Sequence, residues 1–433
     1  MLSRARRSAV ALCALSILAL FVLPAAARAG VIVVDISGGG EFTSLPAAIA
    51  AAVDGDTVLI RPGNYTGQAT KIEINGRGLT IAADGTGPVL MPPIQIANAF
   101  FPKRTVLRGL TAHSGPTMTL GPGLTVVASD VLAEGCDFLG HQGGVVTGTV
   151  PGLPGVSVLF GNVVLKDCVV QGGKGADTDP EHELASPGGP AVQAELGTAT
   201  IYGGHLIGGT GGDIFGYPGG AGPGPNGGGP ALLVAADGSF VAGAVLTGGT
   251  GGNGDELRHE SYKYMGGNGI RLEGLHALTV MDVTIEPGVG GFDGNGVQGA
   301  PGLATALDPG GTIVTLHGPY RDYSLGPPTP EGDLLQLSYS GVAGDTLLIF
   351  LSTQPGQLPL PGKQGVWQLG SPLFGPFLMS APTGTLSLNI PIAGVGLGPD
   401  GALLLYEQVF VKPASGPALL SSPSTHLIVD GSL

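Results

Sequence analysis

The chain has 433 residues, and its 80 glycines and 36 prolines are numerous enough to raise low-complexity disorder as a first hypothesis. Disorder is excluded for most of the chain, because 43% of the residues are hydrophobic, only 12% are charged, and Val, Ile and Leu recur in short runs. The formal net charge of -14 excludes nucleic acid and anionic membranes as partners, since both require clustered Lys and Arg. The length predicts two or three domains.

The first segment, residues 1–29, has the pattern of a cleaved secretory signal peptide. Its start is basic, residues 9–23 form an apolar core, and the pattern ends at Ala27-Arg28-Ala29. The alternative is an N-terminal membrane anchor, which the short apolar run and Pro24 oppose. The sequence therefore predicts a secreted or cell-surface protein with no membrane insertion after cleavage.

One helix is predicted, between short strands near the start of the mature chain. A strand is expected at 31–34, and the helix follows, with Thr43 or Ser44 as its cap, Pro46 in its first turn and Asp54-Gly55 at its end. Short apolar runs of strand length come next, at 57–61, 71–74, 79–82 and 105–107. Their spacing is too short for alternating strands and helices.

The middle of the chain repeats. Residues 165–173 align with 201–209, 241–249 and 280–288, at offsets of 36 to 40 residues, and a looser copy precedes them. Each repeat has short apolar runs that cannot bury their faces alone, whereas stacked copies bury a continuous core between parallel strands. The predicted fold is all-β: a right-handed parallel β-helix over 30–312. The helix at 44–54 is expected to cover the open edge of its first coil.

Four Gly-rich segments make the repeats longer than a bare coil requires. They are expected to project as loops from one edge, the alternative being disordered spacers without function. Their residues are 172–189, 208–229, 248–268 and 288–301.

The opening of this region resembles that of the pectin lyase-like superfamily of secreted β-helix proteins. The matching features are the glycines 38–40, Phe42-Thr43-Ser44, the alanine-rich helix, Gly55-Asp56-Thr57-Val58 and Pro62-Gly63-Asn64-Tyr65. The resemblance implies the fold over about two thirds of the chain. The residue strings that mark the superfamily's polygalacturonases, pectinesterases and pectate lyases do not occur here, apart from fragments, which favours a protein without catalytic activity.

A second domain is predicted after a linker at 313–332. Residues 333–433 contain strand-like runs spaced as in a small antiparallel β-sandwich. Trp367, Phe374 and Phe377 are expected to lie in its core. The runs are at 334–339, 346–351, 385–390, 402–411 and 426–429.

The most polar stretches of the sequence fall on the Gly-rich loops. If the loops share an edge, acidic, basic and aromatic side chains meet there in a mixture that suits a polysaccharide. The alternative is a solvated surface that keeps an apolar protein soluble. The residues expected to bind the glycan are Asp213, Phe215, Tyr217, Asp255, Arg258, His259, Tyr262 and Tyr264.

Two further hypotheses concern this loop edge. One is a divergent polysaccharide lyase or glycoside hydrolase, with Arg258 or Lys263 as base and Asp213 or Asp255 near a metal. The other is a purely structural envelope or adhesion protein. Calcium is a candidate cofactor, and no other cofactor is predicted.

The calcium hypothesis depends on GGTGGDIF at 208–215, which begins like a calcium-binding nonapeptide. Asp177, Asp213 and Asn253 occupy the same position of successive repeats, so they suit either a metal site or a hydrogen-bonded ladder. Cys136 and Cys168 also occupy corresponding positions, which suits either a disulfide or inward free thiols.

Overall fold

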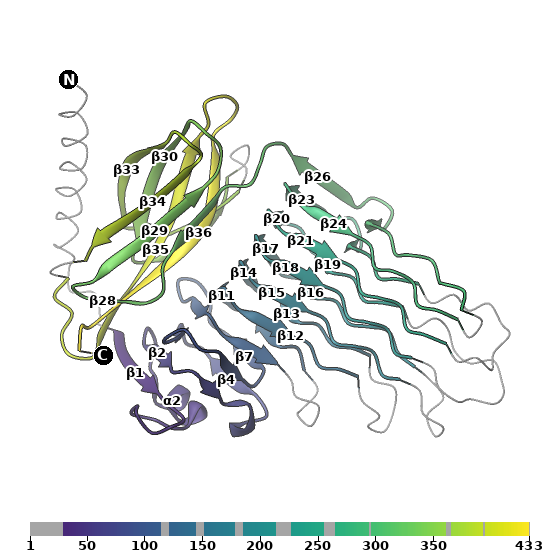
Figure 1. Cartoon of the computed structure of the whole chain (residues 1–433), viewed down its shortest axis with the longest axis horizontal. Coiled ribbons are helices and arrows are strands. Elements are labelled where there is room, and N and C mark those ends of the chain that lie inside the picture. The colour runs from purple at the N-terminus through teal and green to yellow at the C-terminus, as the bar shows by residue number, and fades with distance from the viewer. Residues whose placement is uncertain are drawn as a thin grey trace. The chain divides into compact units, whose positions relative to one another are not determined.

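The computed structural model describes residues 29–113, 121–143, 151–177, 185–213, 227–254, 265–293, 296–360, 365–392 and 395–432, and they are nearly all β (Figure 1). The chain divides into two compact units. The coil unit comprises 33–54 and 58–318, and the C-terminal unit comprises 319–433 together with the short segments 29–32 and 55–57. Among the described residues, no helix is long and apolar enough to span a membrane. The predicted signal peptide lies outside the described residues, except for its last residue.

The coil unit contains three sheets of parallel strands. The first sheet consists of β2 (Thr57–Ile60), β5 (Thr80–Ala83), β8 (Thr105–Arg108), β11 (Asp130–Glu134), β14 (Asn162–Lys166), β17 (Thr198–Tyr202), β20 (Ser239–Ala242), β23 (Ala277–Met281) and β26 (Thr312–Leu316). The second consists of β3 (Gly63–Asn64), β6 (Val89–Met91), β9 (Thr111–His113), β12 (Asp137–Leu139), β15 (Val169–Gln171), β18 (His205–Ile207), β21 (Val245–Thr247) and β24 (Thr284–Glu286). The third consists of β4 (Ile72–Asn75), β7 (Ile94–Ala97), β10 (Leu124–Val127), β13 (Val156–Leu159), β16 (Val192–Glu195), β19 (Leu232–Ala235), β22 (Ile270–Leu272) and β25 (Thr305–Leu307).

The chain visits these three sheets in rotation, so each pass, here called a coil, adds one strand to every sheet. The predicted repeat alignment is confirmed, because Val169 pairs with His205, His205 with Val245, and Val245 with Thr284. Alternate residues point inward, and equivalent positions of successive coils therefore form buried apolar columns. One such column in the second sheet consists of Phe138, Val170, Leu206 and Leu246, all at most 1% exposed.

The predicted helix is present as α2 (Leu45–Ala51), which is followed by a short 3-10 turn, η2 (Thr66–Gln68). Ser44 caps it, since its hydroxyl accepts a hydrogen bond from the Ala47 N–H at 3.4 Å. The helix lies on the first coil: Arg77 donates to the carbonyls of Ile49 and Ala52, and Leu45 is fully buried. These contacts agree with the expected covering role.

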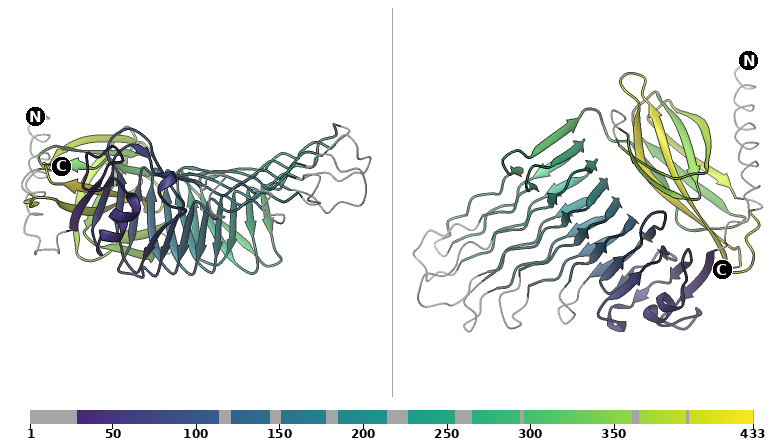
Figure 2. Two further views of the ribbon diagram at one scale, coloured as in Figure 1. Left: turned by 90° about the horizontal axis from the view of Figure 1, so that it is seen from below. Right: turned by 180° about the vertical axis from the view of Figure 1, so that it is seen from behind.

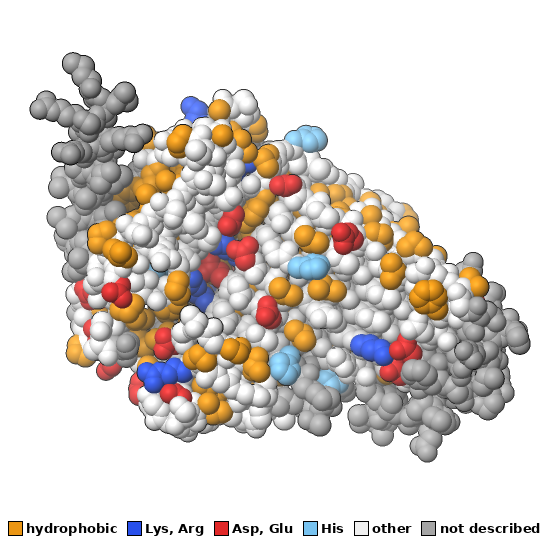
Figure 3. All heavy atoms as spheres, viewed as in Figure 1, with side chains coloured by type: hydrophobic (Ala, Val, Ile, Leu, Met, Phe, Trp, Pro, Cys, Tyr) orange, Lys and Arg blue, Asp and Glu red, His pale blue; other side chains and the backbone are white. Residues whose placement is uncertain are grey.

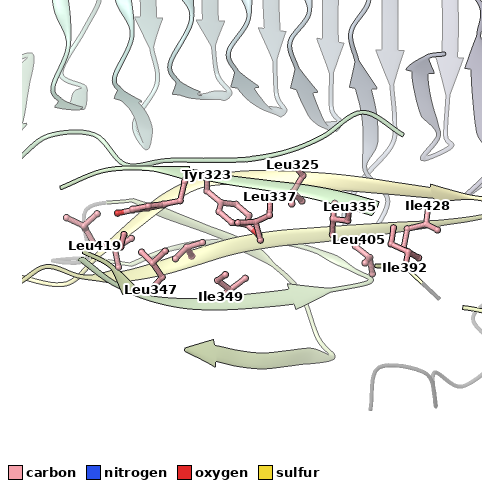
Figure 4. Packing of buried hydrophobic residues seen from close by; sticks show 14 residues of the cluster. Tyr323, Leu325, Leu335, Leu337, Leu347, Ile349, Ile392, Leu405, Leu419 and Ile428 are labelled. Carbon is pink, nitrogen blue, oxygen red and sulfur yellow. The ribbon is translucent and has the colours of Figure 1, made fainter. Parts of the chain in front are cut away.

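The C-terminal unit is antiparallel apart from the short parallel pair β28–β36, and it has one apolar core. Figure 4 shows buried side chains of the core between two layers of strands, including Tyr323, Leu337 and Ile349. The first residues of β1 (Ala29–Val34) pair with β35. The other strands are β27 (Asp322–Leu325), β28 (Thr329–Pro330), β29 (Leu334–Ser340), β30 (Asp345–Ser352), β31 (Pro355–Pro359), β32 (Val366–Leu369), β33 (Leu373–Ala381), β34 (Thr385–Pro391), β35 (Gly401–Lys412) and β36 (Leu419–Val429).

The structure corrects two predictions made for the C-terminal part of the chain. Residues 313–332 were expected to be a linker, but 312–316 form the last strand of the coil unit, and β27 and β28 already belong to the C-terminal unit. Pairing partners far along the chain explain the difference, since Tyr323 pairs with Tyr339 and Thr329 with Ile428. Of the aromatic residues expected in the core, Phe377 packs against it, whereas Trp367 is half-buried edge-on against Phe350.

Candidate functional site on the glycine arms

Five successive coils carry a pair of extended segments between the second and third sheets. Figure 2 shows them running side by side, away from the sheets. We call the segments that leave the second sheet outbound arms and those that lead to the third sheet return arms. The outbound arms are 140–143, 172–177, 208–213, 248–254 and 287–293, and the return arms are 151–155, 185–191, 227–231, 265–269 and 299–304.

Backbone hydrogen bonds in the arms change direction with a period of three residues. The N–H groups of Gly172 and Gly175 donate to the next outbound arm, at Ile207 O (2.9 Å) and Thr210 O (2.8 Å). The intervening Gly173 N–H donates instead to a return arm, at Leu153 O (2.8 Å). Three residues per turn without internal hydrogen bonds is the geometry of polyproline II chains, so the arms form a two-layer array of such chains.

Glycine is required where the two layers meet. A Cβ atom on Gly208, in an outbound arm, would lie 2.0 Å from the carbonyl oxygen of Gly229, in a return arm, and one on Gly248 would lie 2.1 Å from that of Gly267. The close approach allows Gly209 N–H to donate to Gly189 O at 2.7 Å, and the same bond recurs along the stack. The described parts of all four predicted loops are thus ordered by this packing, as collagen is by its axial glycines.

Every third residue of an outbound arm faces away from the array. Because these positions repeat in each coil, their side chains form two rows, which we call the polar arm face. One row contains Lys174, Thr210 and Thr250, and the other contains Asp177, Asp213 and Asn253. On the return arms, Pro187 is exposed and Pro190 and Pro230 are half-buried, at positions where no backbone donor is needed.

The second row is a hydrogen-bonded ladder. Asp177 Oδ1 accepts the Asp213 N–H at 2.7 Å, and Asp213 Oδ1 accepts the Asn253 N–H at 2.7 Å. Asn253 Oδ1 accepts the next N–H, that of Phe292, at 3.0 Å. These contacts confirm the ladder that was predicted as the alternative to a calcium site.

Lys174 supplies the cation of this face. Its Nζ lies 2.8 Å from Asp177 Oδ1 and 2.9 Å from Asp213 Oδ2. Partial burial lowers the pKa of Lys174, but the hydrogen bonds to both carboxylates outweigh it, so the pKa is raised. Among the described residues, no group of three or more His, Cys, Asp and Glu side chains is placed to hold a metal ion. Since Asp177 and Asp213 bind an ammonium group and backbone N–H groups, the calcium hypothesis does not fit their arrangement.

The structure brings together Asp177 and Asp213 from the predicted site. The other predicted residues lie outside the described part of the chain: Phe215, Tyr217, Asp255, Arg258, His259, Tyr262, Lys263 and Tyr264. The arms that lead to them end next to one another, because the ladder joins residues 177, 213 and 253.

Cys136 and Cys168 are free thiols, so the disulfide alternative is not present. Both are buried, and the Cys168 S–H donates to the carbonyls of Lys166 (3.3 Å) and Ala133 (3.4 Å). Burial raises the pKa of Cys168 well above its usual range, and the adjacent Cys136 raises it further. Thiols in this state are poor nucleophiles.

A further row of polar side chains, separate from the polar arm face, lies on the second sheet. His205 Nε2 is 3.0 Å from Thr247 Oγ1, which donates to Glu286 Oε2 at 3.3 Å. The hydroxyl lies between the imidazole and the carboxylate, whereas activation of a nucleophile requires the imidazole in the middle. In the view of Figure 3, His and acidic side chains are scattered rather than gathered in one cluster. This row therefore does not form a nucleophilic triad.

The sequence reasoning missed Lys174 and the three-residue period of the arms. A signal for the period was present, since glycines stand at 208, 209, 211 and 212 and again at 248, 249, 251 and 252. Two glycines followed by one other residue mark two inward positions and one outward position. No protein-family model matches this chain, and no curated protein matches it.

Proposed function

We propose that this is an exported, non-catalytic protein that binds extracellular polysaccharide at the polar arm face. We also infer that the coil unit is a right-handed parallel β-helix of the pectin lyase-like kind. Three parallel sheets visited in rotation support the fold, as do α2 and the opening that resembles this superfamily. The predicted signal sequence supports export.

The observation that carries the binding proposal is the regular spacing of the polar arm face. Coils repeat about every 4.8 Å, and the two rows are three residues apart, about 9 Å along the arm. An extended polymer that lies along the stack meets a polar side chain of each row in three successive coils. Because the arms are held by backbone hydrogen bonds, little conformational entropy is lost when a ligand binds.

The charge of the protein favours an uncharged polymer. The chain carries a net charge of -14, and the Lys174 ammonium group is already shared between two carboxylates. A polyuronate would be repelled, whereas neutral sugar hydroxyls donate to carboxylates and accept from threonine hydroxyls. In this proposal, the predicted aromatic residues Phe215, Tyr217, Tyr262 and Tyr264 add stacking on sugar rings.

The test is retention of the full chain on immobilised neutral and acidic polysaccharides. We expect retention on a neutral glycan, about tenfold weaker in a Thr210→Ala/Thr250→Ala variant, because two hydrogen bonds of roughly 1 kcal/mol each are partly replaced by water. Thr125→Ala, on the third sheet, is the matched control and should bind as the wild type does. Equal weakening by both variants, or no retention on any glycan, would refute the arm face as the site.

The same samples separate the catalytic and structural hypotheses. New reducing or unsaturated chain ends, lost in Arg258→Ala or Lys263→Ala, would replace this proposal with a lyase or hydrolase. If neither cleavage nor retention is observed, the hypothesis of a purely structural protein is favoured.

A further inference from the structure

The two ends of the coil stack differ. At the first end, α2 lies against the first coil and binds it through Arg77 and through Asp54, whose Oδ1 accepts the Gly78 N–H at 2.8 Å. At the last end, β24, β25 and β26 each pair with a neighbour on one side only. The last coil therefore presents three strand edges and the last pair of arms in the same direction.

The last coil exposes side chains that interior coils bury. Leu272 is fully buried, whereas Leu307, its partner at the same position of the next coil, is 44% exposed. A coil follows Leu272 in the stack, whereas none follows Leu307. Large apolar residues also stand at outward positions of the last coil, where the preceding coil has exposed or half-buried polar residues: Val289 follows Thr250, Phe292 follows Asn253, Leu303 follows Asn268, and Val314 follows Thr279.

The sequence places no basic side chain at this end to oppose pairing. Natural sheet edges are often blocked by lysine or by other inward-pointing charges. No Lys or Arg occurs between Arg271 and Arg321, which includes the whole last coil. The exposed edges of β25 and β26 are thus free of charged side chains, and β24 carries one, Glu286.

We propose that the last coil is an interface with a second copy of this chain, joined end to end by the two last coils. A second copy would continue the interface that already joins successive coils. A single peptide strand would complete one edge, whereas another coil end completes three strand edges and the arms together. Since α2 covers the first end, joining last coil to first coil is blocked, and the assembly closes as a dimer.

The topology allows a two-fold axis for this dimer. The chain passes from β24 through the arms to β25 and then to β26. An axis through the arms and the middle of β26 would place β26 antiparallel to β26 of the second copy, and β24 against β25 of the second copy. The inference goes beyond glycan binding and does not depend on it.

Charge sets the conditions under which the dimer forms. Glu286, Asp293 and Asp308 lie on the last coil without a basic residue, so two such ends repel each other. Salt screens this repulsion, and association should strengthen between about 0.01 M and 0.15 M ionic strength.

The test is the mass of the full chain in solution across a concentration series, by sedimentation or light scattering. We expect a dimer for the wild type and at least tenfold weaker association for Val314→Lys and for Leu303→Lys, which carry exposed apolar residues of the last coil. Leu196→Lys is the matched control, because Leu196 is 63% exposed on an interior coil, and it should remain dimeric.

Hydrogen exchange provides a second measurement that does not rely on variants. Amides of 284–286, 305–307 and 312–316 should become more protected as the protein concentration rises. A wild type that stays monomeric at high concentration would overturn the proposal, as would dissociation by Leu196→Lys. Open polymers instead of dimers would show that the two ends do not close as described.

Discussion

Substitution of one glycine of the return arms tests the close packing of neighbouring arms and the hydrogen bonds that join the two layers. In Gly229→Ala the new Cβ would lie 2.0 Å from the carbonyl oxygen of Gly189, whereas real Cβ atoms essentially never come within 3.0 Å of another heavy atom. The arm must therefore move by about 1 Å or more, and the atoms in contact belong to backbone that cannot rotate away.

The free-energy cost follows from the hydrogen bonds that this movement breaks. Gly229 N–H donates to Gly209 O at 2.8 Å, and Gly249 N–H donates to Gly229 O at 2.8 Å. Losing two such bonds, with their partners left buried, costs about 2–4 kcal/mol of the free energy of unfolding. The loss is expected to be greatest in the arms, because the three sheets do not contain Gly229.

The assay combines urea unfolding with hydrogen exchange of the arm amides. Gly227→Ala is the matched control from the same arm: its Cβ would be 3.4 Å from Met265 O, an ordinary contact. For Gly227→Ala we expect an unchanged free energy of unfolding, or a gain of up to about 1 kcal/mol because alanine makes the unfolded chain stiffer. If Gly229→Ala changes stability by less than about 0.5 kcal/mol and leaves the exchange rates of the arms unchanged, the two-layer packing is wrong.

Two other predictions concern buried ionisable groups. Burial raises the pKa of Glu407 to about 7, a smaller and opposite effect coming from the hydrogen bond that Tyr323 donates to it. Because the folded pKa exceeds the unfolded one, the contribution of Glu407 to stability is complete below about pH 4.5 and falls by about 3 kcal/mol as the pH rises through 7. Urea unfolding between pH 4.5 and 8 should show this decline in the wild type and not in Glu407→Gln; parallel curves would contradict it. Cys136 and Cys168 should react with a disulfide reagent at pH 8 only after unfolding, because both are buried and the pKa of Cys168 is raised. Rapid labelling of the native protein at either thiol would contradict that burial.

Much of the coil unit could be predicted from the sequence, because its interactions repeat along the chain. Apolar residues at equivalent positions, such as Val170 and Leu206, identify the inward columns, and the offsets between repeats identify which strands pair. The helix was also predictable, since Ser44, Pro46 and the alanines act locally. In contrast, β27 and β28 resemble a linker in sequence, because their partners lie up to 99 residues away, as for Thr329 and Ile428.

The candidate site could be predicted only in part, since its contacts join different coils. The alignment of Asp177, Asp213 and Asn253 is visible in the sequence, but two arrangements, a metal site and a ladder, share that pattern. Lys174 decides between them, because its ammonium group reaches one carboxylate three residues away and another in the next coil. Only the positions of the outbound arms 172–177 and 208–213 in the structure show that the ammonium group lies between the two carboxylates.

The sequence by itself determined the repeat, the all-β character, the helix at its start and the places where glycine interrupts the strands. These follow from local preferences and from the period of the apolar residues, which act along the chain. The tertiary structure decided that the glycines form a two-layer array, that Cys136 and Cys168 are free thiols and that the last coil is open. Each of these depends on distances between segments of different coils, and such distances are set only when the coils stack.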